Sequence, residues 1–186
     1  MKILILHDTT ATNDNGVDWT SLIIEGLNGE FSVEKISLDS REIKPCMGCF
    51  NCWVKTPGTC IIKKDEGNSI SSSYINSDKV IILSKVTFGG YSSDIKAFMD
   101  RGIVNISPFF EIKNGEMHHK KRYSKYPDLI FIGYGDFTEE EKDTFIELSN
   151  RNALNFSPSK YVTFTIRDST NIREIVEELK DSLHKG

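Results

Sequence analysis

The sequence has little excess charge and no long apolar segment. Its 186 residues carry 23 Lys and Arg against 27 Asp and Glu, a formal net charge of −4, with no basic stripe. Nucleic-acid binding needs clustered positive charge, so we expect no nucleic-acid partner. No run approaches the roughly 18 apolar residues of a membrane span. The apolar start ends at Leu6, and His7 and Asp8 follow it. We therefore expect neither a signal peptide nor a membrane partner.

Cysteine is absent from most of the chain, because all four cysteines lie between residues 46 and 60. A secreted disulfide framework usually spreads its cysteines over a smaller chain. Clustering without a signal peptide indicates a metal, a cluster or thiol redox chemistry, and a cytoplasmic location. The composition, 38% hydrophobic and 27% charged, excludes disordered and fibrous classes. No linker or repeat divides the chain, so we expect one domain over residues 1–186.

Short apolar runs without alternation recur at residues 3–6, 80–83, 129–132 and 162–166. Such runs are typical of parallel strands buried on both faces, whereas residues 31–36 predict a more exposed edge strand. Helical patterns lie between them, at residues 19–27, 66–75, 95–99 and 172–183. A further helix begins with a capping box at Thr138. The alternation predicts a three-layer α/β/α sandwich with a flavodoxin-like five-stranded parallel sheet, order 2-1-3-4-5.

Residues 104–127 do not fit this alternation. Asn114 and Gly115 lie near their centre, and Asn-Gly between two extended flanks predicts a β-hairpin. We therefore expect an inserted β-hairpin arm, with His118 and His119 exposed on it. Two interpretations stay open: a solvated excursion, or a dimerisation arm that buries Phe109 and Phe110 against a partner.

The loop after the first strand is a candidate phosphate site. In open α/β sheets, ligands bind beyond the carboxyl ends of the strands, where the strand order reverses. Here hydroxyl and amide side chains precede a helix N-terminus, which favours anions. The candidates are Thr9, Thr10, Thr12, Asn13 and Asn15. The loop also has three aspartates and no Lys or Arg, so the alternative is a polar loop with Asp18 as an ordinary helix cap.

The loop after the third strand is the candidate site for a flat ring. Paired glycines allow close backbone approach, two aromatic side chains offer faces, and the N–H groups of Gly89 and Gly90 are candidate donors to an isoalloxazine ring. The alternative is a strand-to-helix turn whose aromatic residues belong to the core. The candidate residues are Thr87, Phe88, Gly89, Gly90, Tyr91 and Ser92.

Residues 77–101 resemble the NAD(P)H-dependent FMN reductase family of flavodoxin-like proteins. They contain a buried strand, an aromatic–glycine turn and a helix with Lys-x-Phe-x-Asp-Arg. Residues 46–65 are similar to the cysteine-bearing branch that includes iron–sulfur flavoproteins. The resemblance implies FMN at the switch point, with residues 87–92 along the ring and residues 9–15 at the phosphate. It also implies NAD(P)H as hydride donor and a homodimer or homotetramer, and it names no catalytic side chain.

The four cysteines form a compact motif: Cys46, Cys49, Cys52 and Cys60, separated by two, two and seven residues. Thiolates at this spacing can hold one [4Fe–4S] cluster, whereas zinc usually takes two separated pairs. The third interpretation is reduced thiols packed around Trp53. The resemblance supports a cluster. Just after the motif, Asp65 and Glu66 are expected to cap the next helix, and a contact with the flavin is the alternative.

We therefore expect a cytoplasmic, FMN-dependent NAD(P)H oxidoreductase with a small-molecule or protein electron acceptor. Two other interpretations stay open. One is a non-enzymatic flavin and iron–sulfur electron carrier without a nicotinamide site. The other is a flavin-free domain whose cysteine loop binds zinc or is structural, and the acidic first loop is the feature that favours it.

Overall fold

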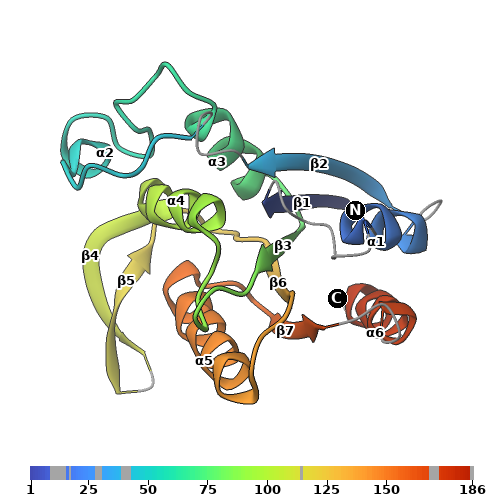
Figure 1. Cartoon of the computed structure of the whole chain (residues 1–186). Coiled ribbons are helices and arrows are strands. Elements are labelled where there is room, and N and C mark those ends of the chain that lie inside the picture. The colour runs from blue at the N-terminus through green and yellow to red at the C-terminus, as the bar shows by residue number, and fades with distance from the viewer. Residues whose placement is uncertain are drawn as a thin grey trace.

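The computed structural model describes residues 1–8, 16, 18–27, 31–38, 43–113, 115–167 and 172–184. Its main element is a five-stranded parallel sheet in the order β2-β1-β3-β6-β7 (Figure 1). Counting only the strands of this sheet, the order is 2-1-3-4-5, which confirms the predicted topology. The strands are β1 (Lys2–Asp8), β2 (Ser32–Leu38), β3 (Lys79–Lys85), β6 (Asp128–Tyr134) and β7 (Tyr161–Ile166).

Burial distinguishes the central strands from the edges. In β1, β3 and β6 almost every residue is buried, because helices cover both faces of the sheet. β2 and β7 have more exposed residues, as edge strands do, which confirms the expectation for residues 31–36. The register aligns Leu4 with Val80 and Val80 with Leu129, so equivalent side chains face the same layer.

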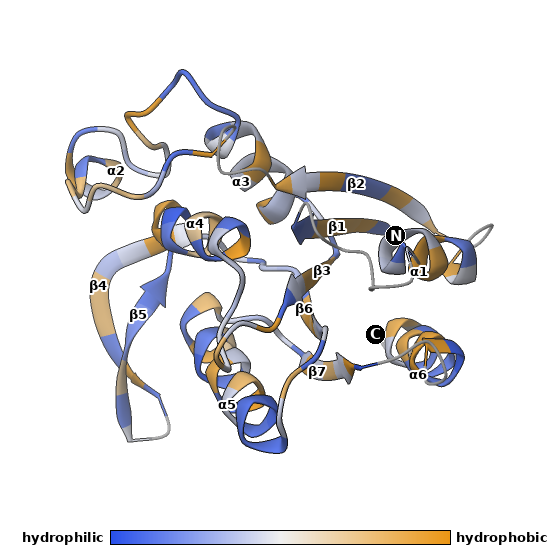
Figure 2. Cartoon of the chain, in the orientation of Figure 1, coloured by the Kyte–Doolittle hydropathy of each residue, from blue (hydrophilic) through white to orange (hydrophobic). Residues whose placement is uncertain are grey.

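The helices form two layers around the sheet. α3 (Gly67–Ile75), α4 (Ser93–Arg101) and α5 (Glu139–Phe156) cover one face, over a core that includes Leu4, Val80 and Phe131. α1 (Trp19–Leu27) and α6 (Ile172–His184) cover the other, over Ile5, Ile81 and other residues. Figure 2 shows α6 with one apolar and one hydrophilic side, as a helix between core and water requires. The predicted three-layer sandwich is therefore confirmed. None of the helices described combines the length and apolar character needed to cross a bilayer.

The predicted hairpin is also present. β4 (Ile106–Lys113) and β5 (Glu116–Lys121) pair in an antiparallel two-stranded sheet outside the main one, as Figure 1 shows. Asn114 lies outside the described residues, and Gly115 adopts φ +81°, a left-handed conformation that glycine tolerates. The capping box of α5 is confirmed, because the Thr138 side chain accepts from the Glu141 N–H while Glu141 accepts from the Thr138 N–H.

Two short helices complete the fold. α2 (Asn51–Val54) lies within the cysteine segment, and η1 (Gly102–Asn105) leads from α4 into the hairpin. Neither was predicted, because four residues are too few for a helical period to appear in the sequence.

Candidate functional site

The carboxyl ends of β1, β3 and β6 meet at the point where the strand order reverses. This is where open α/β sheets bind ligands. The predicted phosphate-binding residues Thr9, Thr10, Thr12, Asn13 and Asn15 lie outside the described residues. The described part of this edge consists of Asp8, the segment 86–92 and the segment that begins at Gly135.

The start of α1 carries its own anion, the carboxylate of Asp18. Its Oδ1 accepts from the N–H groups of Thr20 at 2.9 Å and Ser21 at 3.2 Å, and its Oδ2 accepts from the Ser21 hydroxyl. Burial alone would raise the pKa of Asp18, but these hydrogen bonds outweigh it and the pKa is lowered. Asp18 therefore caps α1, as the alternative interpretation of this loop had it. A phosphate at this helix end would have to compete with a carboxylate for the same donors.

The turn after β3 presents an aromatic ring to solvent. Thr87 and Gly90 exchange both backbone hydrogen bonds, at 3.0 and 2.9 Å, which closes a tight turn. Its two central residues, Phe88 (φ 50°) and Gly89 (φ 75°), are left-handed. This conformation costs a residue with a side chain about 1–2 kcal/mol. The Phe88 side chain is 90% exposed. A strained turn that displays a large apolar ring indicates a binding function.

The same turn restricts which donors a ligand can use. The Gly90 N–H is bonded to the Thr87 carbonyl, so Gly90 does not offer the free N–H that the sequence suggested. Among the residues described, the N–H groups of Phe88 and Gly89 have no hydrogen-bond partner. Gly89 is buried, and a Cβ there would lie 2.8 Å from Thr144 of α5. Gly89 thus also serves to pack the turn against α5.

The other two predicted ring contacts have structural roles. Tyr91 is buried against Phe131 and Phe145, and its hydroxyl contacts Ser149 at 3.3 Å and Asn152 at 3.2 Å. For Tyr91, the alternative of a core aromatic residue therefore describes the structure. Ser92 is the N-cap of α4, and its side chain accepts from the Ile95 N–H.

Asp8 is a buried carboxylate at the centre of this edge. Its Oδ2 accepts from the Lys85 N–H at 2.7 Å, and its Oδ1 accepts from the Tyr134 hydroxyl. The side chain thus ties together the carboxyl ends of β1, β3 and β6 where the first loop departs. The sequence shows Asp8 as the residue that ends the apolar start and as one of three aspartates that oppose phosphate binding. Its position at the end of an apolar run was the available signal of a buried role.

The four cysteines line one small apolar cavity together with Ile62, Arg101 and Val104. Gly48 (φ 64°) and Phe50 (φ 54°) are left-handed and turn the backbone between the thiols. The Gly48 N–H lies 3.5 Å from the Cys46 sulfur. The Asn51 backbone N–H lowers the pKa of the exposed Cys49 thiol, whereas burial and the other three cysteines raise that of Cys52. The loop therefore gathers four free thiols.

These thiols do not form a preformed site for a single ion. Within the described ranges, no three His, Cys, Asp or Glu side chains lie close enough together to hold one metal ion. This disfavours tetrahedral zinc, which needs four ligands on one atom. A four-iron cluster differs, because each thiolate binds its own iron and the sulfurs lie farther apart. The cavity is about 20 Å³, so a cluster would also extend toward the exposed Cys49.

A buried ion pair lies at the base of the cysteine loop. Arg101 at the end of α4 contacts Asp65 through both terminal nitrogens, at 2.8 and 3.3 Å. Asp65 also accepts from the backbone N–H groups of Lys44 and Gly67. Its bond with the Gly67 N–H caps the start of α3, and this is only a part of the role of Asp65. Glu66 is the N-cap residue of α3, but its side chain makes no cap hydrogen bond. The sequence could not reveal the ion pair, because its members lie 36 positions apart.

Aromatic rings connect the cysteine loop to the hairpin. Trp53 lies 5.1 Å from both Phe50 and His119, and His119 lies 4.4 Å from Phe110, between ring centroids. The expectation that both hairpin histidines are exposed is wrong. His118 is buried against α5, where its Nδ1 lies 3.2 Å from Asn155, and His119 is half-buried in the ring contacts. The physical reasons are that one face of the hairpin packs on α5, which buries His118, and that the rings of Trp53 and Phe110 cover His119 from the other face.

Comparison with known proteins agrees with these features. No family model matches the chain. It is 40% identical over 77 residues to an iron–sulfur flavoprotein of Methanocaldococcus jannaschii, covering 41% of this chain and 36% of that protein. It is 34% identical over 74 residues to one of Archaeoglobus fulgidus, covering 40% and 32%. The resemblance to iron–sulfur flavoproteins is confirmed, over about a third of the length of these relatives.

Solved structures with the same fold cover nearly the whole chain. An azoreductase from Bacillus anthracis has a TM-score of 0.60 at 11% identity, over 98% of this chain and 94% of the other. An NADH:FMN oxidoreductase in apo form has a TM-score of 0.62 at 9% identity, over 97% of this chain and 87% of the other. An NADPH-quinone reductase from P. pentosaceus has a TM-score of 0.57 at 9% identity, over 96% of this chain and 94% of the other. At such low identity these likenesses establish the flavodoxin-like fold alone.

Proposed function

We propose that the protein is an FMN-dependent oxidoreductase that takes reducing equivalents from NAD(P)H. The observation that carries the proposal is the exposed, strained turn Thr87–Gly90 at the switch point of the sheet. The names of the relatives and structural neighbours support the same class, since they include iron–sulfur flavoproteins, an NADH:FMN oxidoreductase and an NADPH-quinone reductase. The electron acceptor would be a small molecule or a redox protein.

In this proposal the chain binds and orients the cofactor, and it provides no acid or base. FMN, when bound, supplies the hydride chemistry. The exposed ring of Phe88 offers a stacking face, and the free N–H groups of Phe88 and Gly89 offer donors to the heteroatoms of the isoalloxazine edge. Asp8 holds the three strand ends in a fixed relation through Lys85 and Tyr134.

We further propose that Cys46, Cys49, Cys52 and Cys60 bind a [4Fe–4S] cluster. The chemistry of the donor set fits, because four thiols without competing carboxylates line one apolar cavity beside a buried guanidinium. A cluster, when bound, would supply a one-electron centre at the same edge of the molecule as the flavin. The Gly48 N–H near the Cys46 sulfur is a donor of the kind that tunes such centres.

A purification without oxygen tests both proposals. The visible spectrum, FMN, iron and acid-labile sulfide are measured on one sample, and anaerobic NADH and NADPH consumption follows. We expect flavin bands with a broad shoulder, and about four iron and four sulfide per chain. Flavin without iron would overturn the cluster alone. A coloured protein that oxidises neither nicotinamide would be an electron carrier instead of a reductase.

The cap at Asp18 favours one other candidate, a flavin-free domain with a redox-active or structural cysteine loop. The carboxylate already occupies the N–H groups of Thr20 and Ser21 at the helix end where a phosphate would bind. A protein that stays colourless after addition of FMN would support this candidate and overturn the flavin proposal.

A further inference from the structure

Arg101 is a buried cation beside the four thiols. Its side chain is 1% exposed and lines the same cavity as Cys46, Cys49, Cys52 and Cys60. A charged group is placed in such a position only when its charge is compensated, since desolvation costs several kcal/mol. Gly67 makes room for it, because a Cβ at that position would lie 2.5 Å from the guanidinium.

The guanidinium holds both ends of the cysteine segment. Nη1 donates to the Lys44 carbonyl at 2.9 Å, two residues before the first cysteine. Both terminal nitrogens contact Asp65, which follows the last cysteine by five residues and accepts from the Lys44 N–H at 2.9 Å. The Arg101 side chain therefore closes the base of the cysteine loop, because it contacts Lys44 where the loop begins and Asp65 where the loop ends.

Arg101 also has a hydrogen-bond donor that these contacts with Lys44 and Asp65 do not use. Its Nε is buried without a hydrogen-bond partner in the described structure. Burial opposes the charge, but the contacts with Asp65 and the electrostatic influence of Cys60 and Cys46 outweigh it and raise the pKa of Arg101. The guanidinium thus stays charged within electrostatic reach of two thiols that lie on opposite sides of the motif.

α4 connects this cation to the candidate flavin site. Ser92, the last residue of the turn segment, is the N-cap of this helix, whose nine residues run without a break from Ser93 to Arg101. Ser92 also receives a fixed position from Ser84 of β3, because its N–H donates to the Ser84 hydroxyl at 3.0 Å. The same rigid element thus places the ring-binding turn and the cation of the cysteine loop.

We propose that Arg101 is a positioning residue for the four-cysteine centre: it closes the loop between Lys44 and Asp65 and supplies a buried positive charge that raises the reduction potential of the bound cluster. The effect on the reduction potential rests on the proposed cluster, whereas the closure of the loop rests on the protein alone. A centre with four thiolates carries net negative charge, and adding an electron makes it more negative. A nearby fixed cation favours that reduced state.

The charge is tested by redox titration of the reconstituted cluster, monitored by its visible absorption and by electron paramagnetic resonance. Arg101→Gln should lower the midpoint potential, Arg101→Lys should stay near the wild type, and Asp65→Asn should raise it. If Arg101→Gln does not fold, Arg101→Gln combined with Asp65→Asn removes both charges at once, which proteins tolerate better than one unpaired charge. A merely structural role would shift the potential in the same direction for Arg101→Gln and Asp65→Asn, and that result would overturn the electrostatic part.

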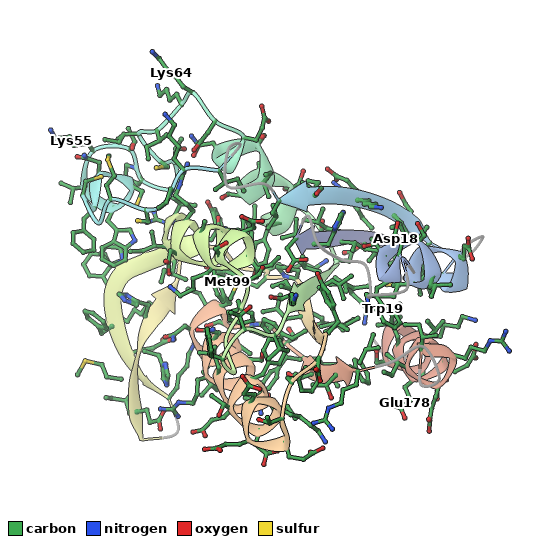
Figure 3. The ribbon with its side chains drawn as sticks, in the orientation of Figure 1. Asp18, Trp19, Lys55, Lys64, Met99 and Glu178 are labelled. Carbon is green, nitrogen blue, oxygen red and sulfur yellow. The ribbon has the colours of Figure 1, made fainter. Side chains whose placement is uncertain are left out.

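The closure of the loop by Arg101 is tested by digesting metal-free protein with trypsin. Trypsin cleaves after the exposed Lys55, Lys63 and Lys64 of the cysteine loop. Figure 3 shows the side chains of Lys55 and Lys64 extending away from the loop. Arg101→Gln should accelerate cleavage at these lysines by about tenfold or more, since a broken buried pair leaves Asp65 uncompensated. Lys96→Gln on the exposed face of α4 is the matched control and should not. Equal cleavage rates in wild type and Arg101→Gln would overturn the closure. A wild type that binds no iron would refute the proposed cluster and leave this test valid.

Discussion

At the scale of single residues, the carboxylate of Asp18 lies where an anionic ligand would compete with it. Asn caps helices about as well as Asp, so Asp18→Asn keeps the cap and removes the charge. We expect FMN to bind several-fold more tightly to this variant, while the free energy of unfolding falls by about 0.3–1 kcal/mol because the helix dipole loses its compensating charge. Titration of FMN fluorescence measures the affinity, and chemical denaturation measures the stability.

Asp18→Ala is the matched control, because it removes the charge and the cap together. It should also strengthen FMN binding but destabilise the protein by about 1 kcal/mol. An Asp18→Asn protein with unchanged or weaker FMN affinity would show that the phosphate does not bind near this helix end.

His7 provides a prediction about pH. Its Nδ1 lies 2.8 Å from the Asp8 carbonyl, which can only accept, so Nδ1 carries the proton, and Nε2 is buried without a partner in the described structure. Burial, assisted by the charge of Lys35, lowers the pKa of His7 below its usual 6.5. Between the folded and unfolded pKa values the unfolded chain binds more protons, so stability should fall as pH drops below about 6.5, by about 1.4 kcal/mol for each unit of pKa depression.

His7→Asn is the appropriate comparison, because Asn retains an N–H near the position of Nδ1 and does not titrate. Urea unfolding at pH 7, 6 and 5 should show a smaller loss of stability in the variant than in the wild type. The carboxylates whose pKa is lowered, such as Asp65 and Asp78, lose their contribution only at more acidic pH. Parallel curves for the two proteins would mean that His7 is not held neutral by burial.

At the scale of elements, the turn after β3 contains one residue that we expect to bind the ligand, Phe88, and one that packs against α5, Gly89. Phe88 is exposed and contributes little to the core, so Phe88→Ala should weaken FMN binding by about tenfold, the value of one lost stacking contact, without lowering the melting temperature. Gly89→Ala, in contrast, should mainly lower the stability of the protein. Its positive φ and the contact with Thr144 predict a destabilisation of about 1–3 kcal/mol.

Thermal unfolding and FMN titration of the same two variants check this pair of expectations. Gly90→Ala serves as the control, because a Cβ there meets only the Thr87 carbonyl at 3.5 Å, an ordinary contact. If Phe88→Ala binds FMN as tightly as the wild type does, the ring has another role.

The sequence predicted elements whose signals are local. Uninterrupted apolar runs identified the strands, Asn-Gly identified the hairpin, and the Thr138 capping box identified the start of α5. What it did not predict depends on partners far along the chain. The pairing of Arg101 with Asp65, and of Asp8 with Tyr134, arises only when the sheet and the helix layers bring them together. Tyr91 and Phe88 are both aromatic residues beside glycine, and only the left-handed turn decides which of them is buried.

At the scale of the whole molecule, the hairpin leaves an apolar surface uncovered. Cross-strand pairs place Phe110 opposite His119 and Ile112 opposite Met117. Phe110, Ile112 and Met117 are 54, 69 and 67% exposed, and Phe109 is exposed as well. The opposite face is different, because His118 and Glu116 contact Asn155 and Arg151 of α5. A hairpin with one packed face and one apolar, exposed face has the properties of an association surface.

We propose that this face binds a second copy of the chain and expect a homodimer or homotetramer in sedimentation velocity experiments. Changing Phe110 and Ile112 together to Ser should shift the protein to monomers, since the fully buried core of an interface depends on such apolar side chains. The melting temperature of the monomer should hardly change, because neither side chain belongs to the core. Lys120→Ser, on the same strand as Met117, is the control and should leave the assembly intact. A wild type that sediments as a monomer at tens of micromolar would contradict the proposal. Assembly that survives the double substitution would place the interface on another surface.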